Sequence, residues 1–385
     1  MNTFGVDYQP GVTVIALREE GDETAQIGLV GDGVRSQIPN AASAAGDWGS
    51  RALSHSDICR PSSEDGAWVE EPGARVFWEG LYGRLAAYLG RLAPVRKNGY
   101  RLAVALQGAN YRTEAHTVAA VARAAGFDEV TVLPATHALL CRGLASGAME
   151  PAKRQTIVAI AVGEASTLVA GFRLEGNNRG LTAIADTSAP WSIDGAGESV
   201  WNRRVLELVR RRLNEAPAAG FERALREAAV RYAARLSQAS DHQPVEWHEI
   251  FEERLYAPLS LSYADCAGWP EFVSFSHQLP DAVRGAMQAI GGESPELLLV
   301  GGMGSVWPFA ERIAARLGPV WRSGAAAEDI AVGAAWWGEL AEHPSGMLLA
   351  SAPELEAPAS AASGLETGQD QSALLPPWER GHADE

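Results

Sequence analysis

The chain has 385 residues, which is enough for two domains or one large bilobal unit. A formal net charge of −16 argues against a broad nucleic-acid surface and against binding to an anionic membrane. The three cysteines are far apart, so neither a disulfide framework nor a cysteine-ligated metal site is expected. The sequence has no apolar run of membrane-spanning length and no secretion signal at its start, so we expect a cytoplasmic protein.

The first part of the sequence predicts a hairpin followed by alternating strands and helices. Residues 4–17 mix β-branched and apolar residues around Pro10-Gly11, which predicts two strands joined by a turn. Residues 46–73 lack a clear period and predict a loop, whereas helical spacing returns over residues 76–92. Elements then alternate: a strand at 101–106, a helix capped by Thr113, a strand at 130–133 and a helix opened by Pro134. This alternation predicts a largely parallel sheet.

A second series of elements begins near Lys153. Three consecutive segments predict a strand meander: residues 156–163, 168–174 and 180–186. Residues 198–213 and 221–236 predict helices, and the first of them is amphipathic.

An apolar run at residues 297–300 leads into a glycine turn, Gly301-Gly302-Met303-Gly304. A helix follows at once, with Ser305 as its expected cap and Pro308 near its first turn. Such a strand–glycine–helix unit is a place where a nucleotide can rest, but its glycines can equally serve close packing of helix and strand. A last helix is expected at residues 330–340, and its adjacent residues Trp336 and Trp337 must face different sides.

Several of these segments resemble, in order, the ATPase domain of the Hsp70/actin superfamily, and most closely its Hsp70 (DnaK-like) branch. The segments that carry the resemblance are Phe4-Gly5-Val6-Asp7, residues 105–126, 133–144 and 157–172, Asp194-Gly195-Ala196-Gly197-Glu198, residues 225–229, Val300-Gly301-Gly302 and residues 331–335. The resemblance implies an α/β, bilobal actin-like fold with two ribonuclease-H-like subdomains around a central cleft. It implies a first lobe of residues 1–150, which includes part of the helix at 330–341, and a second lobe of residues 151–341. The family's peptide-binding domain has no counterpart in this sequence.

The resemblance also implies that ATP or ADP binds with Mg²⁺ in the cleft. It assigns Asp7 to the orientation of Mg²⁺ or its bound water, as the catalytic residue of an active ATP hydrolase. It places the other contacts to the nucleotide on Gly163, Ser166, Gly197, Glu198, Gly301, Gly302 and Gly304. We expect no metal site built from protein side chains alone.

The residues around this predicted site depart from the family pattern. Gln9-Pro10-Gly11 replaces the family's Gly-Thr-Thr, and Pro10 removes one backbone donor. In the second loop, Ala161 replaces an aspartate, and Glu164 places a negative charge where phosphates would lie, unless it is simply exposed at a hairpin tip. Leu133 replaces the family's catalytic glutamate. The catalytic lysine falls near Leu53, and the adenosine-side helix has Val230 and Ala233.

These departures predict a degenerate Hsp70-like protein that binds nucleotide weakly or not at all. Such a protein would act as a chaperone-like or scaffold partner of other proteins. Two alternatives stay open: an active ATP-dependent chaperone or ATPase whose loops have diverged, and an actin-like protein that forms assemblies.

Residues 342–385 have the composition of a disordered acidic tail. Its two apolar segments, Met347-Leu348-Leu349 and Leu374-Leu375-Pro376-Pro377-Trp378, are candidate contacts for a protein partner, and an idle tail is the alternative. His137 falls on a predicted buried helix and is expected to be a core histidine. Asp241-His242 and His248-Glu249 are expected to lie in a solvated polar loop rather than in a metal site.

Overall fold

The computed structural model of the chain describes residues 2–9, 11–19, 25–27, 37–57, 72–92, 100–107, 111–124, 127, 129–150, 153–177, 180–186, 190–212, 225, 228, 231–232, 235–236, 239, 242–247, 250–251, 254–255, 259–302, 307–323, 328–341 and 349–351. All of these residues belong to one compact unit, Met1–Ser351. Within them, no helix has both the length and the apolar character that crossing a membrane requires.

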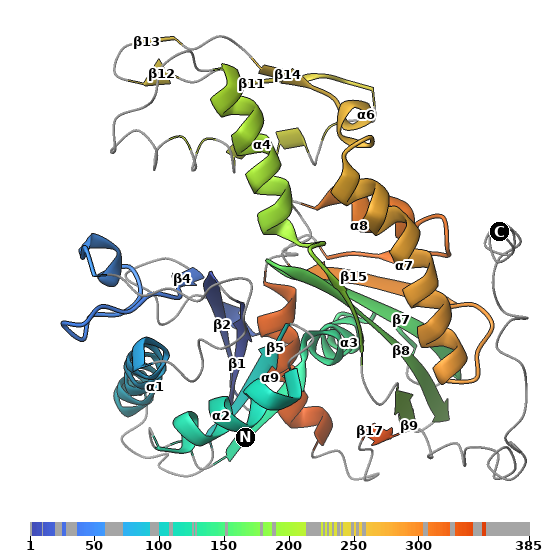
Figure 1. Cartoon of the computed structure of the whole chain (residues 1–385). Coiled ribbons are helices and arrows are strands. Elements are labelled where there is room, and N and C mark those ends of the chain that lie inside the picture. The colour runs from blue at the N-terminus through green and yellow to red at the C-terminus, as the bar shows by residue number, and fades with distance from the viewer. Residues whose placement is uncertain are drawn as a thin grey trace, which may run out of the picture. The chain divides into compact units, whose positions relative to one another are not determined.

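The first sheet is built on the predicted hairpin (Figure 1). Its six strands are β1 (Asn2–Tyr8), β2 (Val12–Arg18), β3 (Gln26–Ile27), β4 (Gln37–Pro39), β5 (Tyr100–Leu106) and β6 (Glu129–Pro134). They lie in the order β3-β2-β1-β5-β6, with β4 paired to β2. Strand β1 is antiparallel to β2 and parallel to β5, which is parallel to β6. The hairpin and the strand–helix alternation are confirmed, but the sheet is mixed rather than largely parallel because the hairpin strands join it antiparallel.

The second sheet contains the predicted meander. Its seven strands are β7 (Gln155–Val162), β8 (Ser166–Asn177), β9 (Gly180–Asp186), β10 (Trp191–Asp194), β15 (Leu297–Gly302), β16 (Val320–Trp321) and β17 (Leu349–Ser351). They lie in the order β16-β15-β7-β8-β9-β17, with β10 paired to β8. The pairs β7–β8 and β8–β9 are antiparallel, whereas β15 is parallel to both β7 and β16.

The two sheets repeat one strand order. In each, three consecutive antiparallel strands are followed in the chain by two strands that add in parallel on the free side of the first. The second sheet follows the same rule with β7-β8-β9 and then β15 and β16. The chain therefore has an α/β fold with two mixed sheets.

The helices with described bounds are α1 (Pro72–Leu92), α2 (Tyr111–Ala124), α3 (Ala135–Ala145), α4 (Glu198–Arg212), α6 (Tyr263–Cys266), α7 (Pro270–Ala289), α8 (Pro308–Ala314) and α9 (Asp329–Ala341), with a 3-10 turn at Ala52–Ser54. Four short strands, β11 (Val245–Trp247), β12 (Ile250–Phe251), β13 (Arg254–Leu255) and β14 (Leu259–Leu261), pair as β11–β14 and β12–β13.

Two helix caps differ from the sequence-based expectation: α2 begins at Tyr111, ahead of Thr113, and the N-cap of α8 is Trp307. Pro308 opens α8 as expected, and Ser305 lies outside the described residues.

Two helices, α3 and α9, each pack mainly on the sheet that does not contain the strand preceding them in the chain. Helix α3 follows β6 in the chain but packs mainly on β7, β8 and β15, and to a smaller extent on β5 and β6. Helix α9 follows β16 but packs mainly on β1, β2 and β5, and to a smaller extent on β15. The helices also contact each other closely at Gly333, where a Cβ atom would overlap the carbonyl oxygen of Ala138. At Gly5 of β1, a Cβ atom would overlap the carbonyl oxygen of Ala331 in α9. The α3–α9 pair therefore joins the two sheets. At Gly333 and Gly5 the backbones approach so closely that they leave no room for a side chain.

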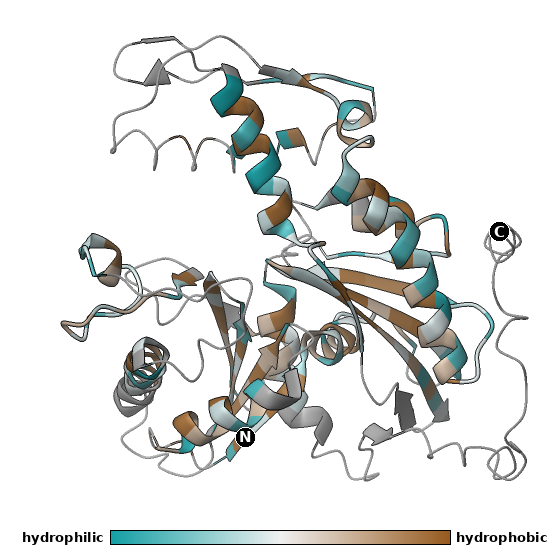
Figure 2. Cartoon of the chain, viewed as in Figure 1, coloured by the Kyte–Doolittle hydropathy of each residue, from teal (hydrophilic) through white to brown (hydrophobic). Residues whose placement is uncertain are grey.

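Apolar side chains fill the interior, and Figure 2 shows the described strands of both sheets as largely hydrophobic. The largest buried side chains include Trp78, Trp201 and Trp307. The two tryptophans of α9 face different surroundings, as expected. Trp336 stacks on the guanidinium of Arg18, 3.8 Å from the ring centroid, whereas Trp337 packs against the core around α3.

The end of the compact unit differs from the predicted tail. Leu349–Ser351 form β17, which pairs in parallel with β9 and extends the second sheet, although we expected a disordered tail from residue 342. These residues are ordered by backbone pairing with the edge of the sheet, and the composition of the segment does not indicate such pairing. Met347, Leu348 and the segment Leu374-Leu375-Pro376-Pro377-Trp378 lie outside the described residues.

Candidate functional site

The predicted site residues lie at strand ends and at one helix start. Asp7 lies in β1, Gly163 and Ser166 close the β7–β8 turn, Gly197 and Glu198 begin α4, and Gly301 and Gly302 end β15. Gly304 lies outside the described residues, as do Pro10, Val230, Ala233, Asp241, His248 and Glu249.

The carboxyl group of Asp7 is enclosed by neutral amides. Its side chain is fully buried, and Gln9 donates from Nε2 to Oδ2 at 2.8 Å. Gln107 donates from Nε2 to Oδ1 at 3.4 Å. Burial raises the pKa of Asp7 to about 7, and the two amide hydrogen bonds oppose that rise. Both oxygens that would orient a metal-bound water therefore already have donors within the chain.

Gln107 was not singled out from the sequence, although the sheet register places it at the site. The parallel pairing of β1 with β5 sets Tyr8 beside Leu106, so Gln9 and Gln107 leave the sheet as neighbours. Gln107 also reaches the second hairpin, because a Cβ atom at Gly163 would overlap its Oε1. One amide side chain thus touches both hairpins of the predicted phosphate site.

The turn of the first hairpin uses its backbone groups internally. The Gln9 amide donates to the Val12 carbonyl at 3.0 Å, and the Asn40 amide donates to the Gly11 carbonyl at 3.0 Å. The Asn40 side chain donates to the Gln9 carbonyl and accepts from Thr13 Oγ1 at 2.7 Å. Asn40 follows β4, which pairs with β2, so the register of the sheet delivers the residue that fixes this turn.

The Gly11 amide donates to the carboxylate of Glu164, across 153 positions of the chain. A Cβ atom at Gly11 would lie 2.5 Å from Glu164 Oε1, so a larger residue here would require the Glu164 side chain to shift. Glu164 is half-buried, which raises its pKa, and the hydrogen bond from Gly11 opposes that rise. The alternative of an exposed side chain at a hairpin tip is therefore wrong, because the carboxylate folds back onto the other hairpin.

The first amides of α4 bind the second hairpin instead of facing a free space. Glu198 N donates to the Gly163 carbonyl at 3.0 Å, and Ser199 N donates to the Glu164 carbonyl at 2.8 Å. A Cβ atom at Gly197 would overlap that same Glu164 carbonyl. These donors are the ones with which a helix N-terminus can bind an anion, and here carbonyl groups of the chain take them.

The Glu198 side chain points into the protein and is only 5% exposed. Asn202 donates to its Oε1 at 3.3 Å, while Oε2 is buried and has no partner among the described residues. Burial raises the pKa of Glu198 to about 7, the Asn202 bond lowers it, and the nearby charge of Glu164 raises it further. The carboxyl groups of Glu164 and Glu198 therefore lie close enough that a charge on one disfavours a charge on the other.

Apolar residues lie at the three positions where the resemblance would place catalytic groups. Leu133 and Ala161 are buried in β6 and β7, and Leu53 is half-buried in the 3-10 turn. In the part of the chain that the structure describes, no group of three or more His, Cys, Asp or Glu residues is arranged to hold a metal ion.

Packing explains both described glycines of the β15 turn. A Cβ atom at Gly301 would lie 2.5 Å from Leu139 of α3. Gly302 has a φ of 89°, which favours glycine, and a Cβ atom there would overlap the Val162 carbonyl oxygen. The described contacts of Gly301 and Gly302 are therefore contacts between the strand and its neighbours in the chain.

A buried carboxylate beside this turn was missed in the sequence. Asp329, at the start of α9, is 1% exposed and accepts from Arg142 Nε at 3.2 Å and from Ser323 Oγ at 2.5 Å. Burial raises its pKa, and the two partners oppose that rise. Because Arg142 belongs to α3, this pair fastens α3 and α9 together.

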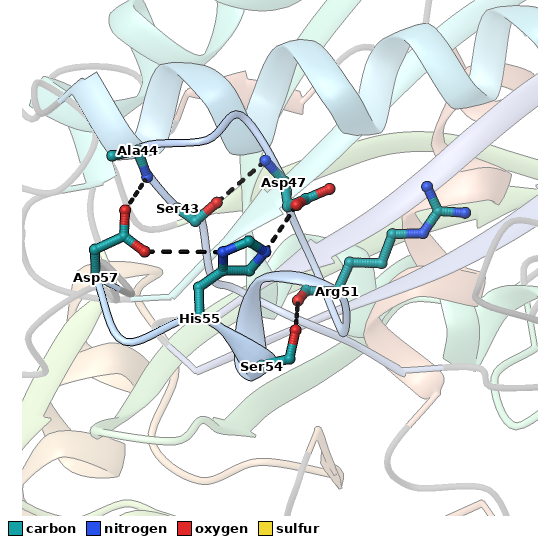
Figure 3. Close-up of polar contacts among 7 residues, drawn as sticks. All are labelled: Ser43, Ala44, Asp47, Arg51, Ser54, His55 and Asp57. Carbon is teal, nitrogen blue, oxygen red and sulfur yellow. Dashed lines mark hydrogen bonds and ion pairs between the residues drawn. The ribbon is translucent and has the colours of Figure 1, made fainter.

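A separate polar cluster lies in the loop after β4. Figure 3 shows its members: Ser43, Ala44, Asp47, Arg51, Ser54, His55 and Asp57. His55 places Nε2 2.8 Å from Asp47 and Nδ1 3.9 Å from Asp57, so each ring nitrogen faces a carboxylate. The Ser54 hydroxyl donates to the Arg51 carbonyl at 2.8 Å rather than to the ring. The cluster holds the loop and does not form a serine–histidine nucleophile.

His137 is a core residue, as expected. It is 6% exposed, and its ring meets the Phe172 ring edge-on with 5.1 Å between centroids.

Comparison of the chain with models of known protein families and with curated proteins gave no match. The described site therefore stands on its own chemistry. It consists of three buried or half-buried carboxyl groups, Asp7, Glu164 and Glu198, whose hydrogen-bond donors are amides of the same chain.

Proposed function

We propose that this chain is a degenerate Hsp70-like ATPase-domain protein that binds nucleotide weakly or not at all and works by holding protein partners, as a scaffold or in a chaperone-like role. The repeated strand order of the two sheets supports an actin-like fold with two ribonuclease-H-like subdomains. The exchange of α3 and α9 between the sheets supports it as well.

One observation gives the main support for weak or absent nucleotide binding: the Glu164 carboxylate accepts a hydrogen bond from the Gly11 amide. A phosphate between these hairpins would need that donor and would meet the charge of Glu164. Like charges about 4 Å apart repel by about 4 kcal/mol at an effective dielectric constant near 20. In this structure the Glu164 carboxylate therefore takes the donor that a phosphate between the two hairpins would use.

The second candidate is an active ATP-dependent chaperone or ATPase. Asp7, Ser166 and the Gly301-Gly302 turn, which occur in the order of the family, favour it. In that case Mg²⁺ or its bound water would have to displace the side-chain amides of Gln9 and Gln107 from the carboxyl group of Asp7. The two candidates differ in whether Mg-ATP stabilises the native protein.

Saturating Mg-ATP is expected to leave the melting temperature of the full chain within about 1 °C of its value with Mg²⁺ alone. A ligand present at 100 times its Kd stabilises the native state by about 2.7 kcal/mol, which shifts the melting temperature by several degrees. Differential scanning fluorimetry measures this shift. An increase of several degrees, lost in Asp7→Ala, would contradict weak nucleotide binding and favour the second candidate.

A further inference from the structure

We propose that Glu164 and Glu198 form a proton-dependent clasp between the two hairpins: the Glu164 carboxylate holds the Gly11 amide while Glu198 carries a proton, and loss of that proton releases the contact. The inference concerns the control of the site and holds whether or not a nucleotide enters it.

The geometry links the two carboxyl groups through a few backbone bonds. The tip of the second hairpin gives the Gly163 and Glu164 carbonyls to the amides of Glu198 and Ser199, at 3.0 and 2.8 Å. The start of α4 is therefore hydrogen-bonded to Gly163 and Glu164, and the side chain of Glu164 reaches the first hairpin. A change at Glu198 acts directly on the segment that carries Glu164.

The hydrogen-bond donors to both carboxyl groups are neutral. The first hairpin offers the Gly11 amide to Glu164, and α4 offers the Asn202 amide to Glu198. The carboxyl that faces this region from β1, Asp7, is itself covered by the amides of Gln9 and Gln107. In the described part of the chain, no ion pair joins Glu164 or Glu198 to a basic residue. Each carboxylate therefore meets the negative charge of the other without a compensating cation.

The unpartnered oxygen of Glu198 fits a protonated group. Its Oε2 is buried and accepts no hydrogen bond from the described residues, which costs more free energy for a carboxylate than for a neutral carboxylic acid. Burial and the charge of Glu164 raise the pKa of Glu198 to about 7. Burial raises the pKa of Glu164 as well, but the Gly11 hydrogen bond opposes that rise and favours the charged form. The pair thus holds one charge on Glu164 and one proton on Glu198.

The direction of the pH effect follows from these positions. Below about pH 7, Glu198 is protonated and Glu164 keeps the Gly11 amide. Above this pH, Glu198 ionises, and repulsion drives the Glu164 carboxylate toward water because it is the less buried of the two. The Gly11 amide then loses its acceptor and exchanges its hydrogen with solvent.

Hydrogen–deuterium exchange of the peptide that contains Gly11 tests the clasp in the full chain. Wild type and Glu198→Gln are compared at the same pH, so that the intrinsic exchange rate of the peptide is identical. At pH 8.5, Gly11 is expected to exchange about tenfold faster in wild type than in Glu198→Gln, which stays neutral. At pH 5.5, the two proteins are expected to match.

Two further variants make the result specific. Glu207→Gln removes a more exposed carboxylate from the same helix and is expected to behave as wild type at both pH values. Glu164→Ala removes the acceptor and is expected to expose Gly11 at both. Equal protection in wild type and Glu198→Gln at pH 8.5 would overturn the proposal. A ¹³C-detected titration in which the Glu198 carboxyl ionises near its ordinary pKa would overturn it as well, even if a variant failed to fold.

Discussion

Asp7→Asn is expected to raise the free energy of unfolding at pH 8 by about 2 to 4 kcal/mol and to change it little at pH 4. Burial raises the pKa of Asp7 from 3.8 to about 7 in the folded protein. Between these values the unfolded chain releases this proton and the folded chain keeps it, so wild type loses stability as the pH rises toward 7. Each unit of pKa shift corresponds to about 1.4 kcal/mol, and asparagine carries no such penalty.

Urea unfolding at pH 4, 6 and 8, followed by tryptophan fluorescence, measures this effect. Asp194→Asn serves as the control, because Asp194 is exposed and accepts a hydrogen bond only from the neighbouring Ser192 in the described structure. Its effect is expected to stay within about 0.5 kcal/mol at all three values. If Asp7→Asn destabilised the protein at pH 8, Asp7 would be an ionised, stabilising group and not a residue held in a neutral enclosure.

Gly333→Ala is expected to destabilise the protein by about 3 kcal/mol, although alanine is the better helix former. The added Cβ atom would overlap the Ala138 carbonyl oxygen and lie 3.1 Å from the Arg142 amide nitrogen. Both atoms belong to the backbone of α3, so the helices must separate to accept the methyl group. Separation would also loosen the Arg142–Asp329 pair that joins the same helices.

Gly83→Ala is the matched control, because Gly83 lies inside α1 and a Cβ atom there has no neighbour within 4 Å. The same change is expected to stabilise the protein by about 0.5 to 1 kcal/mol through helix propensity. Thermal or urea unfolding of both variants gives the comparison. Similar effects from the two substitutions would contradict the close α3–α9 packing.

Local sequence patterns predicted most of the regular elements. The β-branched residues on both sides of Pro10-Gly11 gave the first hairpin, and the strand at β7, the meander after it and α4 were also expected. Each of these depends on periodicity or turn residues within a short segment. The strand β17 was missed because its position depends on pairing with β9, far away in the chain.

The hydrogen-bond partners of the site residues were harder to predict from the sequence than the positions of these residues along the chain. The sequence indicated that Glu164 adds a charge between the hairpins, but not that this charge binds Gly11, because the contact joins residues 153 positions apart. Gln107 and Asn40 reach the site through strand register, which the sequence alone does not set. Asp329 gave no motif signal, since a carboxylate at the start of a helix is common on protein surfaces.

Isothermal titration of the full chain with Mg-ATP, combined with a measurement of phosphate release, tests the central claim most directly. If Glu164 occupies the place of a phosphate, no saturable heat is expected at ATP concentrations up to about 1 mM, which limits the binding free energy to about −4 kcal/mol. Phosphate release is expected to equal that of Asp7→Ala. Micromolar binding with hydrolysis that Asp7→Ala abolishes would contradict the account.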